Sequence, residues 1–110
     1  MAYDEDLANR IREVLAQRRG VDERPMFGGL AFLIGGHMAV AASGKGGLMV
    51  RVAPDDTENL LKRAHVSPMV MAGRETRGWV RVDASGVKTQ RQLTSWITRG
   101  VDYARSLPPK

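Results

Sequence analysis

The chain has 110 residues, the length of one domain, of which 43% are hydrophobic and 26% charged. This composition argues against wholesale disorder and against a membrane span, because the longest apolar run, around residues 30–34, is far too short to cross a bilayer. The lack of cysteine excludes disulfides, a thiol nucleophile and a thiolate metal site.

The net charge of +5 is concentrated in the last third of the chain, where residues 74–110 carry eight bases and three acids. Such an excess is typical of a solvated face or of a surface for nucleic acid or an acidic partner. The first residues show neither the basic stretch nor the apolar segment of a signal peptide, so we expect a cytoplasmic protein.

The first predicted element is a helix over residues 4–19. Apolar residues recur there at spacings of three and four, which places them on one side of a helix. Acids occupy the first turn, bases the last, and Gly20 follows at the position of a C-terminal cap. Both ends therefore agree with the helix dipole.

Glycines then separate short apolar runs, a pattern typical of strands and turns. We expect antiparallel strands over residues 30–34, 37–42 and 48–52. Gly35-Gly36 predicts a two-residue hairpin, because both central residues of a type I′ turn have positive φ. Three strands in a meander are the simplest arrangement.

A short helix is predicted after Pro54, followed by two strands over residues 69–71 and 77–83 that are joined at residues 72–74. The last helix begins with a capping box formed by Thr89 and Gln92. The expected fold is α+β, a single five-stranded antiparallel sheet with packed helices in the order α-β-β-β-α-β-β-α. Residues 1–110 form one domain.

Few side chains in this sequence fit a catalytic or ligand-binding motif. Gly44-Lys45-Gly46 lacks the upstream glycine and the following Ser or Thr of a phosphate-binding loop. His37 and His65 have no metal-ligand partner at suitable spacing, and we expect a structural role for His65. We therefore predict no catalytic residues, no cofactor and no metal, and we expect that the protein is not an enzyme.

One surface pattern points to an interaction site. Along residues 48–52 and 77–83, strand alternation places arginines with Trp79 and Met49 on one face and aliphatic residues on the opposite, core-facing side. This candidate interaction face consists of Met49, Arg51, Arg77, Trp79 and Arg81. Such a face could stack bases, take a peptide or close a dimer, or it could lie under a helix with its arginine heads in solvent.

The sequence resembles the TfoX N-terminal domain family over about residues 5–106. The resemblance rests on Met26-Phe27-Gly28-Gly29, on the segment 47–52, on Pro68-Met69 and Gly73-Arg74, and on Arg77-Gly78-Trp79-Val80. It implies an α+β domain with a five-stranded antiparallel sheet. The family takes its name from bacterial regulators of competence, whose full-length forms carry an additional C-terminal domain that is absent from this sequence.

The resemblance and the missing catalytic motifs favour a non-enzymatic regulatory or protein-interaction module linked to transcriptional regulation. The expected partner is another protein, and a homodimer is the simplest form because one patch serves both subunits. The alternative is direct nucleic-acid binding through the basic C-terminal third, on the helix face formed by Lys88, Arg91, Arg99 and Arg105. An enzyme whose site escapes these motifs is the third reading.

Overall fold

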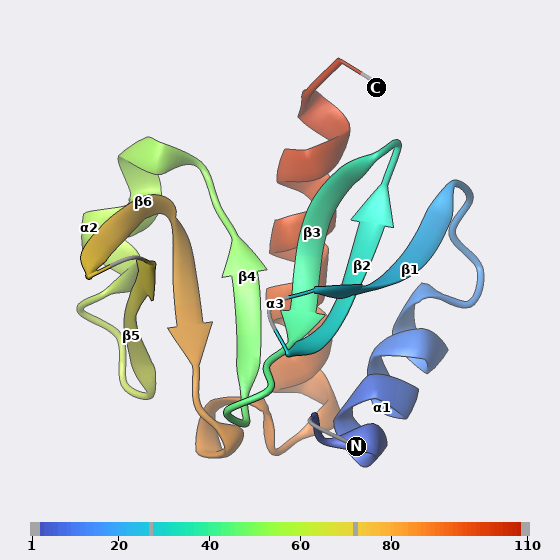
Figure 1. Cartoon of the computed structure of the whole chain (residues 1–110), viewed down its shortest axis with the longest axis horizontal. Helices are drawn as coiled ribbons and strands as arrows, with labels where there is room; N and C mark the ends of the chain where they lie inside the picture. Colours follow the sequence, from blue (N-terminus) through green and yellow to red (C-terminus); the bar gives the residue numbers. More distant parts are fainter. Residues whose placement is uncertain (1–2, 27, 72, 109–110) are drawn as a thin grey trace.

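The computed structural model describes residues 3–26, 28–71 and 73–108 (Figure 1). Its elements in chain order are α1 (Glu5–Leu15), β1 (Val21–Met26), β2 (Gly29–Ile34), β3 (His37–Ala42), β4 (Leu48–Arg51), the 3-10 helix η1 (Pro54–Asp56), α2 (Thr57–Leu60), β5 (Val66–Met71), β6 (Arg74–Val82), the 3-10 helix η2 (Ala84–Val87) and α3 (Gln90–Ser106). No helix within these ranges is long and apolar enough to span a bilayer.

The strands form one antiparallel sheet of six strands in the order β1-β2-β3-β4-β6-β5, so the expectation of five strands was wrong. The missed strand, β1, has no buried residue and contains Asp22, Glu23, Arg24 and Pro25. It is an edge strand, and charged residues and proline protect such an edge from pairing with other chains. An edge strand of this kind lacks the apolar alternation by which strands are recognised in a sequence.

Several predicted boundaries also change. The first helix ends at Leu15 rather than at residue 19, and the helix after Pro54 is only a 3-10 turn followed by the four residues of α2. Strand β5 starts at Val66, before Pro68, because an edge strand tolerates a residue without a backbone N–H. Two residues named in the sequence analysis lie outside the described residues. They are Ala72, in the turn expected at residues 72–74, and Phe27, in the segment 26–29 that resembles the TfoX N-terminal domain family.

Two local predictions are confirmed. Gly35 and Gly36 join β2 to β3 with φ values of 59° and 86°, as the hairpin requires. At the start of α3 the backbone N–H of Gln92 donates to Thr89 Oγ1 over 3.1 Å, and the backbone N–H of Thr89 donates to Gln92 Oε1 over 2.9 Å. The capping box therefore forms with both of its hydrogen bonds.

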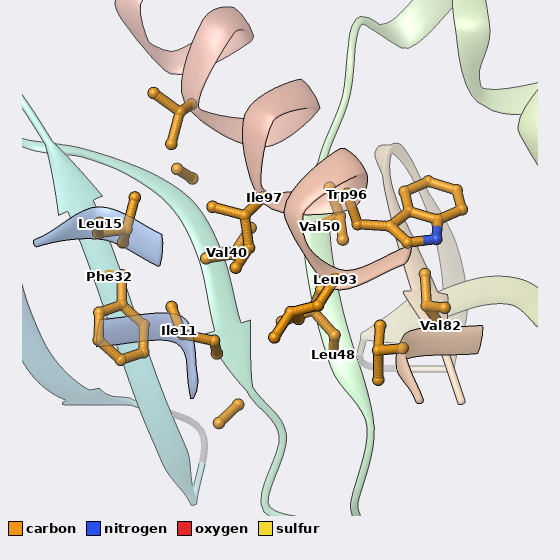
Figure 2. Close-up of a cluster of buried hydrophobic side chains, with 14 of the residues drawn as sticks. Ile11, Leu15, Phe32, Val40, Leu48, Val50, Val82, Leu93, Trp96 and Ile97 are labelled. Atoms are coloured by element: carbon orange, nitrogen blue, oxygen red, sulfur yellow. The ribbon is translucent and has the colours of Figure 1, made fainter. Parts of the chain in front are cut away.

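The main core lies between the sheet and the two long helices (Figure 2). Helix α3 contributes Leu93, Trp96, Ile97 and Val101, and α1 contributes residues such as Ile11 that pack with it. We call the sheet surface beneath them the helix-covered face. Its buried residues are Leu30, Phe32, Ile34, Val40, Ala42, Leu48, Val50, Val80 and Val82.

Helix α3 comes unusually close to strand β3 at Gly100. A Cβ built at this glycine would lie 2.5 Å from the carbonyl oxygen of Ala39 and 3.0 Å from Val40 Cγ1. Real Cβ atoms do not approach a backbone oxygen this closely. The absence of a side chain therefore sets the depth at which α3 sits on the sheet.

The edge strand β1 is tied to α1 by a bidentate ion pair. Arg12 donates from Nε and from Nη2 to the two carboxylate oxygens of Glu23, each over 2.8 Å. These hydrogen bonds hold the pKa of the Glu23 carboxyl below its usual value. The pair fixes the helix against the strand on the helix-covered side of the sheet.

Replacing Ile97 by alanine should reduce the free energy of unfolding by about 2–5 kcal/mol, because the side chain is fully buried between α3 and the sheet. Urea denaturation of the native and variant chains measures the difference. A loss below about 0.5 kcal/mol would show that α3 does not dock through this residue.

Replacing Gly100 by alanine should also destabilise the fold, by about 1–3 kcal/mol, although alanine is the better helix former by about 1 kcal/mol. The reason is the overlap of the new Cβ with the backbone of β3. The matched control is Thr94→Ala on the exposed side of α3, which should leave stability nearly unchanged. A Gly100→Ala variant more stable than the native chain would contradict the close approach.

Candidate interaction surface

A second apolar cluster covers the other side of the sheet, which we call the helix-free face. No helix residue belongs to it within the described ranges, and Figure 1 views the sheet from this side, with α3 passing behind the central strands. Its buried members are Ala31, Leu33, Ala41, Met49 and Met69, and its partly buried members are Met26, Met38 and Trp79.

The strands themselves shield the centre of this face. All six residues of β2 are buried, although helices cover only one side of that strand. The register shifts between β2 and β3 and again between β5 and β6, and bulges of this kind increase the local bend and twist of a sheet. In Figure 1 β1 crosses in front of β2. Strand β1 thus folds over β2 (Figure 1), and the partly buried residues form an apolar rim around the buried ones.

Four methionines from four different strands meet in this cluster. Met49 and Met69 form its floor, with 4% and 6% of their surface exposed, whereas Met26 and Met38 are only partly buried. Methionine is flexible and polarizable, which suits it to surfaces that adapt to a partner. The rim therefore combines accessible apolar surface with side chains that can rearrange.

Trp79 and Arg51 stand together at one side of this rim. The two residues are paired across β4 and β6, and the Arg51 guanidinium carbon lies 5.7 Å from the centroid of the Trp79 ring. The same carbon lies 5.7 Å from the centroid of Tyr103 on α3. Two aromatic rings thus hold a positive charge beside the apolar surface, as cation–π contacts do.

The structure brings together only part of the candidate face predicted from the sequence. Met49, Arg51 and Trp79 adjoin one another, and Arg81 is paired with Met49. The Arg81 guanidinium donates to Ser43 Oγ and to the Gly46 carbonyl, over 3.3 Å and 3.2 Å, and so supports the β3–β4 turn.

Arg77 lies in different surroundings. Its guanidinium donates to Asp55 and Glu58, over 3.3 Å in each case, and these acids belong to the η1–α2 segment. The strand bends one residue later, at Gly78, where φ is 89°. The Gly78 N–H donates to Thr57 Oγ1 over 3.0 Å and fixes the bend. Arg77 is therefore neutralised at the α2 end instead of joining Trp79.

Arginines outnumber acids on the helix-free face. Directly opposed residues of antiparallel strands share a face, so Asp22 and Arg24 of β1, which oppose Leu33 and Ala31, lie on this side. Together with Arg51 and Arg81, the β1–β2 and β4–β6 pairs place three arginines and one carboxylate on this face. Its rim is accordingly apolar with a positive balance.

The alternative basic face lies on and just before α3. Lys88 directly precedes the helix, and its carbonyl accepts a hydrogen bond from Arg10 over 3.3 Å. Arg91, Arg99 and Arg105 are exposed on the helix itself, and the Arg99 guanidinium carbon lies 6.0 Å from the Trp96 centroid. The four bases lie along one side of the molecule and do not form a single cluster.

The two histidines lie apart, each with a contact of its own. His37 Nε2 is within hydrogen-bond distance of the Pro108 carbonyl, and His65 Nδ1 lies 3.3 Å from Asp83 Oδ1. Among the described residues, no group of three His, Asp or Glu side chains could hold a metal ion.

Sequence reasoning missed the residues that complete the helix-free face, namely Met26, Met38 and Met69. Met26 lies on the strand that was not predicted. Met38 and Met69 lie on predicted strands, but the sequence does not reveal the pairing of β4 with β6 that joins these strands in one sheet. Six methionines in 110 residues was the available signal, and it gives no location by itself.

Comparison with known proteins agrees with the fold. No curated protein matched the chain. The sequence model of the TfoX N-terminal domain family matches residues 13–104, which is most of the chain. This family is not known as a family of enzymes. The chain therefore belongs to the TfoX N-terminal domain family and contains a single such domain.

Proposed function

We propose that this domain is a non-enzymatic regulatory module, linked to transcriptional regulation as its family implies. It binds another protein through the rim of the helix-free face. The partner presents an apolar segment flanked by carboxylates. The observation that supports this proposal is the partly exposed rim of Met26, Met38 and Trp79 around a buried apolar floor, with Arg51 beside it.

The composition of the rim supports protein binding. Tryptophan, methionine and arginine are enriched in protein interfaces, and tryptophan and arginine are the residues whose truncation costs most binding energy. Trp79 already rests on the apolar cluster, and Arg51 lies over its ring, so neither side chain loses much freedom when a partner docks. An interface here would use side chains that the fold has already positioned.

The charge of the surface favours an acidic partner over a second copy of the chain. The β1–β2 and β4–β6 pairs place three arginines and one aspartate on the helix-free face, and the whole chain has a net charge of +5. A two-fold dimer through this face would place two positive surfaces together, which costs free energy. A segment with acids around an apolar centre would bury its apolar residues against the rim and pair its acids with the arginines.

Nucleic-acid binding through Lys88, Arg91, Arg99 and Arg105 is the alternative. Its supporting observation is that these bases are exposed along one side of the molecule. Phosphate contacts would make the affinity fall steeply with salt, whereas an apolar interface would change far less. Salt dependence of partner binding therefore separates the two proposals.

The test is selection of peptides from a random displayed library against the native domain. We expect the selected peptides to combine aromatic or aliphatic residues with Asp and Glu. Trp79→Ala and Arg51→Gln should each weaken their binding about tenfold or more, because both side chains belong to the rim. Arg105→Gln, an exposed arginine on α3, is the matched control and should bind like the native chain.

Circular dichroism must first show that each variant is folded. If Trp79→Ala does not fold, Arg51→Gln still tests the proposal. Selected peptides rich in Lys and Arg, or peptides that bind both variants as tightly as the native domain, would overturn the proposal. A native dimer in sedimentation that Trp79→Ala converts to a monomer would assign this face to a second copy and overturn the acidic partner.

A further inference from the structure

We propose that a pocket beside the first turn of α3 binds the phosphate group of a small phosphate monoester. The basic pocket, as we call it, has a volume of about 390 Å³ and is lined by side chains that include Arg63, His65, Arg91, Gln92, Ser95 and Trp96. This volume is in the range of small-molecule sites, at its lower end. The site lies apart from the helix-free face and is independent of the function proposed for that face.

Arg63 is held in place by an aromatic ring. Its guanidinium carbon lies 4.9 Å from the centroid of Trp96, and the Trp96 ring, with 6% of the residue exposed, is itself fixed in the main core. A cation placed on a buried ring has less freedom than a surface arginine that extends into water. The pocket therefore has a positive group in a defined position before any ligand binds.

The two arginines of the pocket are not neutralised by the protein. Within the described ranges, neither Arg63 nor Arg91 has a carboxylate within 4 Å, in contrast to Arg12 and Arg77, which do. Asp83 lies next to the pocket residue His65. It is engaged by His65 Nδ1 at 3.3 Å and by the Gly86 N–H at 3.1 Å. The pocket thus presents two uncompensated guanidinium groups that come from different parts of the chain.

Neutral donors complete the recognition of an anion. Gln92 uses its Oε1 atom to accept from the Thr89 N–H, so its side-chain amide nitrogen remains to donate into the pocket. Ser95, one turn further along α3, adds a hydroxyl. A phosphate monoester has three peripheral oxygens that accept charge-assisted hydrogen bonds, and arginine matches that geometry in a bidentate manner.

The shape of the pocket favours a small phosphate over a nucleic-acid strand. Arg63 and Arg91 line one concavity, while Lys88, Arg99 and Arg105 do not line it. Binding of a strand would instead use a groove that follows several phosphates and aromatic rings with exposed faces. Among the described residues that line the pocket, the rings are the His65 imidazole, whose Nδ1 is engaged by Asp83, and the Trp96 indole, which is buried under Arg63.

The test is a titration of the native domain with phenyl phosphate, inorganic phosphate, dimethyl phosphate and an unphosphorylated oligothymidine, followed by NMR at constant ionic strength. Phenyl phosphate should bind saturably and shift the Trp96 indole and Arg63 side-chain signals. Dimethyl phosphate, a monoanion, should bind at least about tenfold more weakly. Arg63→Gln and Arg91→Gln should each weaken phenyl phosphate about tenfold or more, since each removes a charge-assisted contact.

Arg105→Gln is the control, because it removes an exposed arginine of the same helix outside the pocket. The proposal would be overturned if phenyl phosphate does not saturate the domain at 10 mM, a concentration on the order of the weakest useful dissociation constants. Equal weakening in the control would overturn it too, because the binding would then reflect only the net charge. Oligothymidine that binds more tightly than phenyl phosphate and competes with it would assign the pocket to a nucleic acid instead.

Discussion

The close packing of α3 on one side of the sheet determines the rest of this structure. Gly100 lets the helix backbone approach β3, and Ile97, fully buried, fills the space beneath the helix. Helix α1 packs into the same core with residues such as Ile11, and Leu60 of α2 joins it next to β6. The opposite side is left without helices among the described residues, and the strands themselves shield its centre instead. A sheet covered by helices on one face only must either be polar on the other or protect its apolar residues in this way.

This asymmetry separates two surfaces with different chemistry. The helix-free face offers methionines and Trp79 at its rim, with a positive balance of charge, and suits an apolar segment with acids. On the other side, the first turn of α3 meets the turn after α2, where Arg63 and Arg91 line one small pocket. The same helix that forms the core thus also provides one wall of the proposed anion site.

Much of the fold was predictable because its signals are local. Residues close together in the sequence determine the apolar face of the last helix, its capping box at Thr89 and the hairpin at Gly35-Gly36. Strand β1 was not predictable, since an exposed edge strand needs no apolar pattern. The candidate site was only half predictable. Alternation placed Arg51 and Trp79 on one face, but the bend at Gly78 directed Arg77 to the acids of the η1–α2 segment. The methionine cluster also depends on β1 and on the pairing of β4 with β6, which no local pattern reveals.

The helix-free face combines a protected floor with an accessible apolar rim. Oxidation of the methionines by hydrogen peroxide, followed residue by residue in a mass spectrometer, tests it directly. Met26 and Met38 should oxidise several-fold faster than Met49 and Met69, whose exposed surface is 4% and 6%. Equal rates at all four methionines would contradict it, because the floor would then be as open to solvent as the rim.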